Sequence, residues 1–268
     1  MTTNFGRVAV FNPSVGITDR SQVGDATDFI NPYEESSSQE FPLGTKLEIG
    51  DRVFRYVLNG ASGISAGKVI MMPAIESNGD VTDMAVDTMA ANSTSLTGVT
   101  NGGNTAITAD EYADGWAHVN SGTAIGTCLQ IKSHPAVATS ASAEFKLYDR
   151  VPLAFAAAST VCLTHSKYYK VIVVATGSLG AVPAQQMIGA TIVALTANYY
   201  GWVLTKGPGA LIAEGTTVVG GPVRPSEGTA GSVTPADLDE ANANIRIIGT
   251  AVHRVTSADA ELIDVNFE

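Results

Sequence analysis

Short runs of alternating apolar and polar residues, separated by turn-forming residues, extend through most of the chain. The pattern is clearest in residues 199–225, where glycine and proline interrupt the apolar runs every six to eight residues. Runs of this length between such breakers are typical of strands in a tight antiparallel meander or a small barrel. We expect three strands here, Tyr200–Leu204, Ala210–Ala213 and Thr216–Val219, separated by turns at Lys206–Gly209 and Glu214–Gly215.

A β-hairpin is expected where the regular pattern begins. Residues 45–49 and 52–57 alternate on either side of a Gly-Asp dipeptide, and glycine supplies the positive φ that a two-residue connection requires. A further strand is expected at 68–72. These elements predict a first β-hairpin unit at about residues 41–85.

The rest of the chain is expected to form a middle β-rich domain at 86–175 and a C-terminal β-meander or barrel domain at 176–268. Helix is expected only as short pieces near 109–114, where a capping-box pattern begins, and near 235–243. The predicted fold class is all-β, with short-stranded antiparallel barrel or meander units and an extended N-terminal arm. The other predicted strands are 116–119, 126–133, 143–147, 171–175, 246–255 and 260–267.

In residues 1–40 only Val8–Phe11 carries a strand pattern, because proline, glycine and serine interrupt the rest. A long irregular segment is unusual inside a compact domain, and a solvated tail carries few aromatic residues. We therefore expect an extended arm that lies on a neighbouring subunit, with a disordered tail as the alternative. The candidate contact residues of the arm are Phe5, Phe11, Phe29 and Tyr33.

Composition is unusual in its low content of charged residues. Only 15% of the residues are charged, against about 25% in an average globular protein, while 45% are hydrophobic and 27 are glycine. Much of the surface must then consist of small polar and apolar side chains. Such a surface is tolerable in a monomer, and it is also what a subunit of a large assembly presents to its neighbours.

The formal net charge of −11, without a basic cluster, argues against nucleic acid and anionic membranes as partners. The N-terminus lacks the apolar core of a signal peptide, and no run reaches the ~18 apolar residues of a membrane span. We therefore expect a protein made in the cytoplasm. Cys128 and Cys162 have no disulfide-framework or metal-site spacing, so both are expected to be small buried hydrophobes.

No catalytic, cofactor-binding or metal site is predicted. Residues 63–67 match the G-x-S-x-G spacing of a nucleophile elbow, but a strand pattern follows them where that motif needs a helix. The histidines have no metal-ligand spacing and are interpreted as ordinary strand or loop residues: His118, His134, His165 and His253. Two groups of acidic residues could bind calcium if the fold brought them together, but neither has the spacing of an EF-hand loop. We interpret them as solvated turn residues: Asp80, Asp83, Asp87, Asp110, Glu111 and Asp114.

Several turn and strand motifs follow one another in an order that resembles one group of viral proteins. They are FPLGT at 41–45, GDRVFRYV at 50–57, ITADEYADGW at 107–116, KLYDRVPLAF at 146–155, YYGWVLTKGPGALIAEGTTVVGGPVRPS at 199–226 and GTAVHRV at 249–255. Over roughly residues 41–268 the chain resembles the capsid decoration (cement) proteins of tailed bacteriophages and related virion structural proteins. The resemblance implies a β-rich shell protein on the outer face of a capsid lattice, often a homotrimer, without catalytic residues.

We therefore expect a non-enzymatic virion structural protein, made in the host cytoplasm, that binds the major capsid protein and copies of itself. The alternative is a tail- or fibre-associated β-rich virion protein or a glycan-binding surface module. A glycan module would expose aromatic side chains, whereas Trp116 and Trp202 both lie in strand patterns that favour the core. Contacts with the shell or a neighbouring subunit are expected at Lys206, Glu214 and Arg224.

Overall fold

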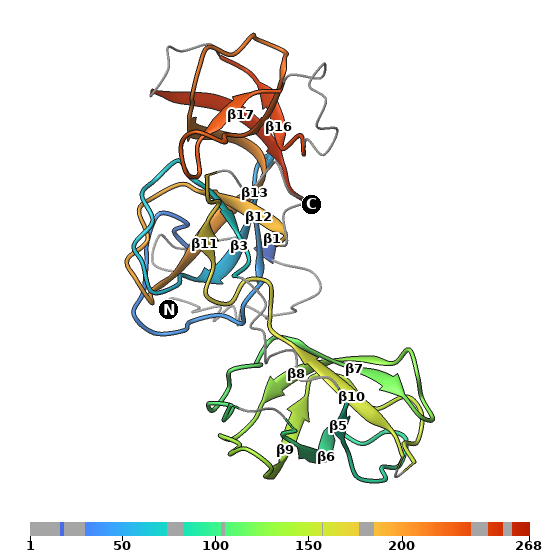
Figure 1. Cartoon of the computed structure of the whole chain (residues 1–268). Helices are drawn as coiled ribbons and strands as arrows, with labels where there is room; N and C mark the ends of the chain where they lie inside the picture. The colour runs from blue at the N-terminus through green and yellow to red at the C-terminus, as the bar shows by residue number, and fades with distance from the viewer. Residues whose placement is uncertain are drawn as a thin grey trace, which may run out of the picture. The chain divides into compact units, whose positions relative to one another are not determined.

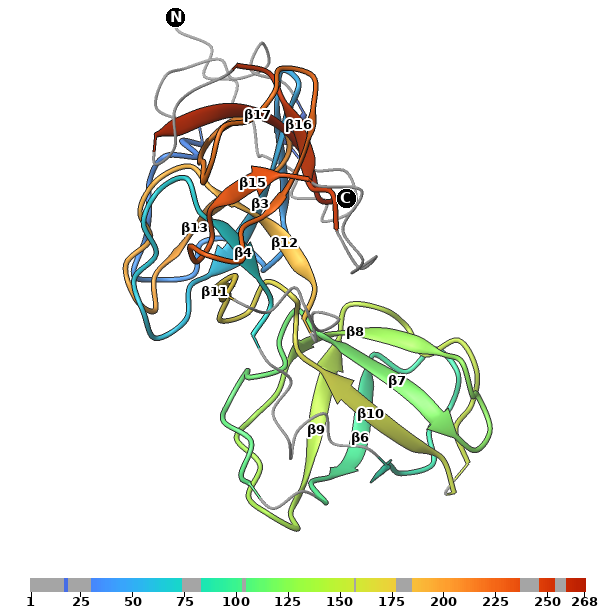
Figure 2. The same ribbon diagram turned by 45° about the horizontal axis from the view of Figure 1, so that its top comes forward.

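The computed structural model describes residues 17–18, 30–73, 83–102, 105–156, 158–176, 185–236, 246–253 and 259–268. The fold is all-β, as the alternation predicts, and none of these residues is helical. The chain forms two compact units (Figures 1 and 2). Unit 1 comprises Met1–Met71, Lys170–Pro183 and Met187–Glu268, and unit 2 comprises Met72–Tyr169 and Ala184–Gln186.

Unit 2 is inserted into unit 1 along the chain. The strand that leads into it, β4 (Val69–Met71), pairs with the strand that follows it, β11 (Ile172–Val173), and Met71 lies opposite Ile172. This organisation differs from the expected division into 41–85, 86–175 and 176–268. The reason is a long-range pairing, since a strand from the first of these segments and a strand from the last are neighbours in one sheet.

The sheet of unit 1 is built mainly from antiparallel neighbours. Its order along the main path is β1 (Ile17–Thr18), β2 (Lys46–Ile49), β3 (Arg52–Leu58), β13 (Tyr200–Ile212), β17 (Ala260–Asn266), β16 (Gly249–Ala251), β14 (Pro222–Pro225) and β15 (Val233–Pro235). β12 (Met187–Thr191) joins β13 to β4. The expected hairpin is confirmed, because β2 and β3 pair directly across the Gly-Asp turn. Only the β1–β2 pairing on this path is parallel.

β13 is one continuous strand of 13 residues, so the turn expected at Lys206–Gly209 is wrong. Its first half pairs with β3 and its second half with β17, around an irregularity between Leu204 and Lys206. Glycine is needed just beyond this point, because a Cβ on Gly207 would lie 2.4 Å from the carbonyl oxygen of Asp51. The residues interpreted as a turn, Lys206–Gly209, therefore lie where β13 changes its pairing from β3 to β17.

Aromatic side chains form the core on one face of the β3–β13 pair. Trp202 is only 3% exposed, and its ring centroid lies 5.1 Å from that of Tyr56 and 5.5 Å from that of Phe41. Tyr200, which is half-buried, stacks on Tyr56 at 5.9 Å. The expectation that Trp202 belongs to the core is confirmed.

The described end of the expected arm packs on its own unit. The carboxylate of Glu35 accepts hydrogen bonds from the backbone N–H and the hydroxyl of Thr196, at 2.7 and 2.6 Å. Arg52 donates to the hydroxyl of Tyr33 at 2.7 Å. This part of residues 1–40 therefore contacts its own unit, and its packing on a neighbouring subunit stays a prediction. The side chains of Phe5, Phe11 and Phe29 lie outside the described residues.

Unit 2 is a curled six-stranded sheet that approaches a closed barrel (Figure 2). Its order is β5 (Met84–Ala85), β10 (Thr160–Thr164), β7 (Trp116–Ser121), β8 (Cys128–Ser133), β9 (Ser142–Leu147) and β6 (Ser95–Thr100). Asp87, just after β5, donates its backbone N–H to Thr97 in β6, which links the two ends of this order. The enclosed core includes Leu96, Ile131, Phe145, Phe155 and Leu163.

Consecutive turns replace the helix expected at 109–114. The buried ring of His134 holds them, because its Nε2 accepts a hydrogen bond from the Tyr112 N–H at 2.9 Å while its Nδ1 lies 2.8 Å from the carbonyl oxygen of Pro135. This arrangement requires a neutral ring with its proton on Nδ1. Of the second expected helix, 235–243, the described residues belong to β15 and its exit, and 237–243 lie outside the described chain.

This histidine makes the stability of unit 2 depend on pH. Burial lowers the pKa of His134 below its ordinary value of 6.5, against the opposing effects of the Pro135 carbonyl oxygen and the carboxylates of Asp110 and Glu111; nearby His165 lowers it further. The unfolded chain then binds a proton at a higher pH than the folded chain, so the free energy of unfolding falls as the pH drops below 6.5.

We expect His134→Gln to flatten this dependence, because the variant has no ring to protonate. Urea unfolding of the parent and the variant at pH 7 and pH 5 measures the effect. His118→Gln, at an exposed position of β7, is the matched control and should retain the parent's dependence. Equal slopes for the parent and His134→Gln would contradict the assignment.

Candidate assembly surface

The last strand of unit 1 carries an acidic residue inside and a leucine outside. In β17, Glu261, Ile263 and Val265 are buried, whereas the alternate residues, including Leu262, are exposed. Successive residues of a strand point to opposite faces, so the phase set by Ile263 and Val265 forces Glu261 inward and Leu262 outward.

Leu262 has an apolar neighbour, Val252, at the end of the adjacent strand β16. Val252 follows β16 and donates its backbone N–H to the Leu262 carbonyl oxygen at 2.9 Å. The turn that carries Val218 and Val219 is bonded to the residue before Val252, because the Gly220 N–H donates to the carbonyl oxygen of Ala251 at 2.8 Å. The turn that contains Gly220 therefore lies next to the end of β16.

The turn Val218–Gly221 presents these two valines to solvent. The Gly221 N–H donates to the Val218 carbonyl oxygen at 2.7 Å, and Gly220 has a φ of +79°, which is typical of the third position of a type II turn. Val218 is 71% and Val219 61% exposed. The strand expected at Thr216–Val219 is therefore wrong, and we call Val218, Val219, Val252 and Leu262 the valine patch.

A buried hydrogen bond fixes the base of this turn. Thr217 points inward, is 1% exposed, and donates its hydroxyl to the carboxylate of Glu261, which is fully buried. The second carboxylate oxygen of Glu261, Oε2, has no hydrogen-bond partner in the described part of the chain. Through this hydrogen bond, Glu261, which precedes Leu262 on β17, fixes the position of Thr217, which precedes Val218 in the turn.

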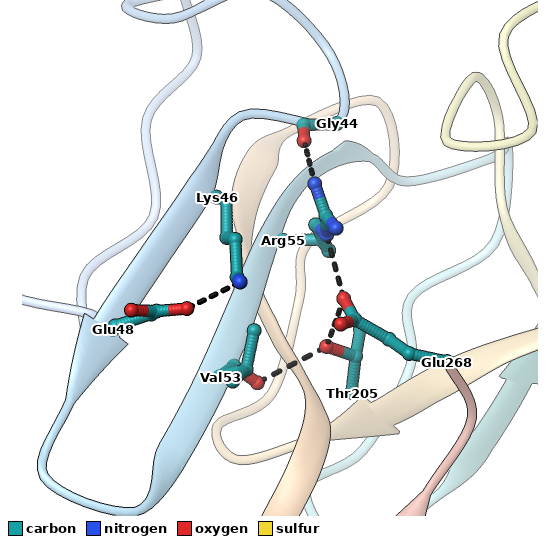
Figure 3. Close-up of polar contacts among 7 residues, drawn as sticks. All are labelled: Gly44, Lys46, Glu48, Val53, Arg55, Thr205 and Glu268. Carbon is teal, nitrogen blue, oxygen red and sulfur yellow. Dashed lines mark hydrogen bonds and ion pairs between the residues drawn. The ribbon is translucent and has the colours of Figure 1, made fainter. Parts of the chain in front are cut away.

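The far end of β17 is held by a polar cluster (Figure 3). Arg55 on β3 donates from Nε to Glu268 at 2.9 Å and from Nη1 to the Gly44 carbonyl oxygen at 3.0 Å, and Thr205 donates to Glu268 at 3.1 Å. Burial raises the pKa of the Glu268 carboxyl, but Arg55, Thr205 and Lys46 together outweigh it and lower the pKa. The strand that carries Leu262 is therefore anchored near both ends.

Of the contact residues expected in this region, only Lys206 is placed differently from the expectation. Lys206 is exposed within β13 rather than in a turn. Glu214 accepts a hydrogen bond from Ser226, and its pKa is lowered chiefly by that bond. Arg224 pairs with Glu227 at 2.9 Å through a side chain that is only 11% exposed, so it helps to hold a loop of its own chain.

Unit 2 gathers several of the residues considered for chemistry. His165 stacks between Tyr112 and Tyr169, with ring centroids 4.1 and 5.2 Å away, and its Nε2 lies 3.5 Å from Glu111. The hydrogen bond to His165 is the main cause that lowers the pKa of Glu111 to about 2. No group of three or more histidine, cysteine or acidic residues is placed to hold a metal ion among the described residues.

The remaining candidates for chemistry have local roles or lie outside the description. Asp83 accepts a hydrogen bond from Asn120, Asp110 from the His134 N–H and Asp114 from the Tyr148 hydroxyl. Asp80 lies outside the described residues. Cys162 is buried as expected, but Cys128 is exposed, contrary to the expectation.

Sequence reasoning missed the valine patch, although one signal was present. The phase of Ile263 and Val265 identifies Leu262 as the outward residue of its strand. The two valines of the turn carry no comparable signal, since Val218 and Val219 resemble the strand in which they were expected.

Comparison with protein families, with curated proteins and with solved structures found no match. The described residues contain no helix that is long and apolar enough to cross a membrane.

Proposed function

We propose that this chain is a non-enzymatic structural protein of a tailed-phage virion. In this proposal it is a capsid decoration protein that binds the major capsid protein on the outer face of the head and stabilises the shell. The observation that supports it is the valine patch, four exposed aliphatic side chains on the anchored strand β17, on the turn Val218–Gly221 and on the residue after β16. Exposed apolar patches commonly mark sites of protein association.

The patch is suited to weak contacts that are repeated many times. Burying one aliphatic side chain contributes about 1.5–3 kcal/mol, and association consumes much of the sum through lost translational and rotational freedom. On a symmetric lattice, a homotrimer would engage several capsid subunits at once, so that weak contacts become collectively strong. A ligand that binds only the assembled shell stabilises that shell.

Attachment to purified heads that lack this protein tests the proposal. We expect the double variant Val219→Asp/Leu262→Glu to bind such heads at least about tenfold more weakly, because two charges would have to be desolvated in the contact. Co-sedimentation of labelled protein with the heads measures the affinity.

The matched control is Ile125→Asp/Leu153→Glu, which places the same charges at two exposed residues of unit 2. It should bind like the parent. Equal attachment of parent and patch variant would refute the role of the patch, and absence of attachment by the parent would refute the decoration function itself.

A further inference from the structure

A second surface, with different chemistry, lies on the outer face of unit 2. Trp116 opens β7 and is 43% exposed, so the expectation that it belongs to the core is wrong. Its backbone pairs with Gln130 on the adjacent strand β8. Tyr148, directly after β9, is also exposed and donates its N–H to the carbonyl oxygen of Gln130 at 3.0 Å. Two aromatic side chains therefore flank one glutamine.

The tyrosine of this pair is held in place before any ligand arrives. Its hydroxyl donates to the carboxylate of buried Asp114 at 3.0 Å, and the ammonium of Lys132 lies 5.9 Å from the ring centroid. Burial, together with the Asp114 carboxylate, raises the pKa of Tyr148, so the hydroxyl stays protonated as the donor. A ring with a fixed orientation loses little entropy when it becomes a binding platform.

Uncommitted polar groups belong to this aromatic pair and its neighbours. Neither the side-chain amide of Gln130 nor the indole N–H of Trp116 makes a hydrogen bond within the described chain. One carboxylate oxygen of Asp149 accepts the Gln130 backbone N–H at 2.8 Å, and the other can accept from a ligand. The face thus offers both donors and acceptors next to flat apolar rings.

The charges of this face are balanced, although the whole chain carries −11. The exposed side chains around the aromatic pair include two lysines, Lys132 and Lys146, and two carboxylates, Glu144 and Asp149. Such a face has no net field to select an anion or a cation. It also differs in composition from a typical interface core, which is depleted of charged residues, and no aliphatic side chain is exposed on β7, β8 or β9.

We propose that the surface formed by Trp116, Gln130, Tyr148 and Asp149 binds an uncharged oligosaccharide of pyranose sugars. A pyranose ring has an apolar face of C–H groups, which packs on the indole of Trp116 or the phenol of Tyr148. Its hydroxyl groups donate to Asp149 and exchange hydrogen bonds with the amide of Gln130. This activity would be added to attachment through the valine patch and does not depend on it.

The intrinsic fluorescence of the whole protein provides the test. The chain has two tryptophans, and Trp202 is buried, so a ligand on the outer face of unit 2 changes the emission of Trp116. Cellohexaose, maltohexaose and chitohexaose are titrated separately. We expect at least one of them to cause a saturable change with a dissociation constant on the order of 1 mM or tighter.

Variants then assign the binding to this face, with calorimetry as the readout where tryptophan is removed. Trp116→Ala and Gln130→Ala should weaken binding at least about tenfold, and Trp116→Phe should restore part of it, because phenylalanine keeps a flat ring. His118→Ala, on the same face of β7, should bind like the parent. Failure of all three sugars to bind, or unchanged binding by Trp116→Ala, overturns the proposal. Neither result bears on attachment to heads, which is measured separately.

Discussion

Trp202→Ala is expected to lower the free energy of unfolding of unit 1 by about 3–5 kcal/mol, the usual range for removal of a large buried aromatic side chain. Trp202 packs on Tyr56 and Phe41 at the centre of the β3–β13 pair, so its loss leaves a cavity. Tyr56 lies in a paired strand and cannot move into the cavity without disturbing the strand register.

The matched control is Trp116→Ala, which removes the same side chain from an exposed position. It should change stability by no more than about 1 kcal/mol. Urea unfolding followed by far-ultraviolet circular dichroism compares the two variants without relying on tryptophan fluorescence. If both variants lost equal stability, the assignment of one tryptophan to the core and the other to the surface would be wrong.

The second large effect is expected at the buried pair of Thr217 and Glu261. Thr217→Val should lower the free energy of unfolding by about 1.5–3 kcal/mol, because it removes a hydrogen bond to a fully buried carboxylate. The valine leaves Glu261 without any partner among the described residues, and a buried polar group without a partner carries its full desolvation penalty.

The double variant Thr217→Val/Glu261→Met distinguishes this explanation from a simple packing defect. Replacement of both partners by apolar side chains of similar size is often neutral or stabilising. We therefore expect the double variant to be more stable than Thr217→Val alone, as measured by urea unfolding. Thr250→Val, at an exposed position of β16, is the control and should change stability by about 0.5 kcal/mol or less. A double variant that is less stable than Thr217→Val would contradict the mechanism.

Local pattern predicted much of the fold in this chain. The all-β class, the hairpin of β2 and β3 and the inward Trp202 follow from alternation and turn chemistry, which act over a few residues. The prediction failed where a distant strand decides the outcome. Lys206–Gly209 contains two glycines and a proline, yet its residues pair with β17 and continue β13.

The candidate site was predicted less well, for a related reason. Alternation predicts that Trp116 and His118 share one face of their strand. It does not predict which face of the curled sheet packs on the core and which faces solvent. The expected contacts Glu214 and Arg224 were chosen as charges near turns, and both turn out to hold loops of their own chain. The link between Thr217 and Glu261 joins residues 44 positions apart and has no local signature.

The insertion of unit 2 sets the order in which the two sheets can form during synthesis. The last strand of unit 2, β10, ends at Thr164, whereas β3, already paired with β2, acquires its second partner, β13, only when Tyr200–Lys206 has been made. A ribosome that works from the N-terminus therefore releases the whole sheet of unit 2 first. Since Met71 and Ile172 are paired neighbours, a folded unit 2 brings the two halves of unit 1 together and shortens the loop that β3 and β13 must close. A folded unit 2 therefore keeps β4 and β11 of the nascent chain close together before β13 has been made.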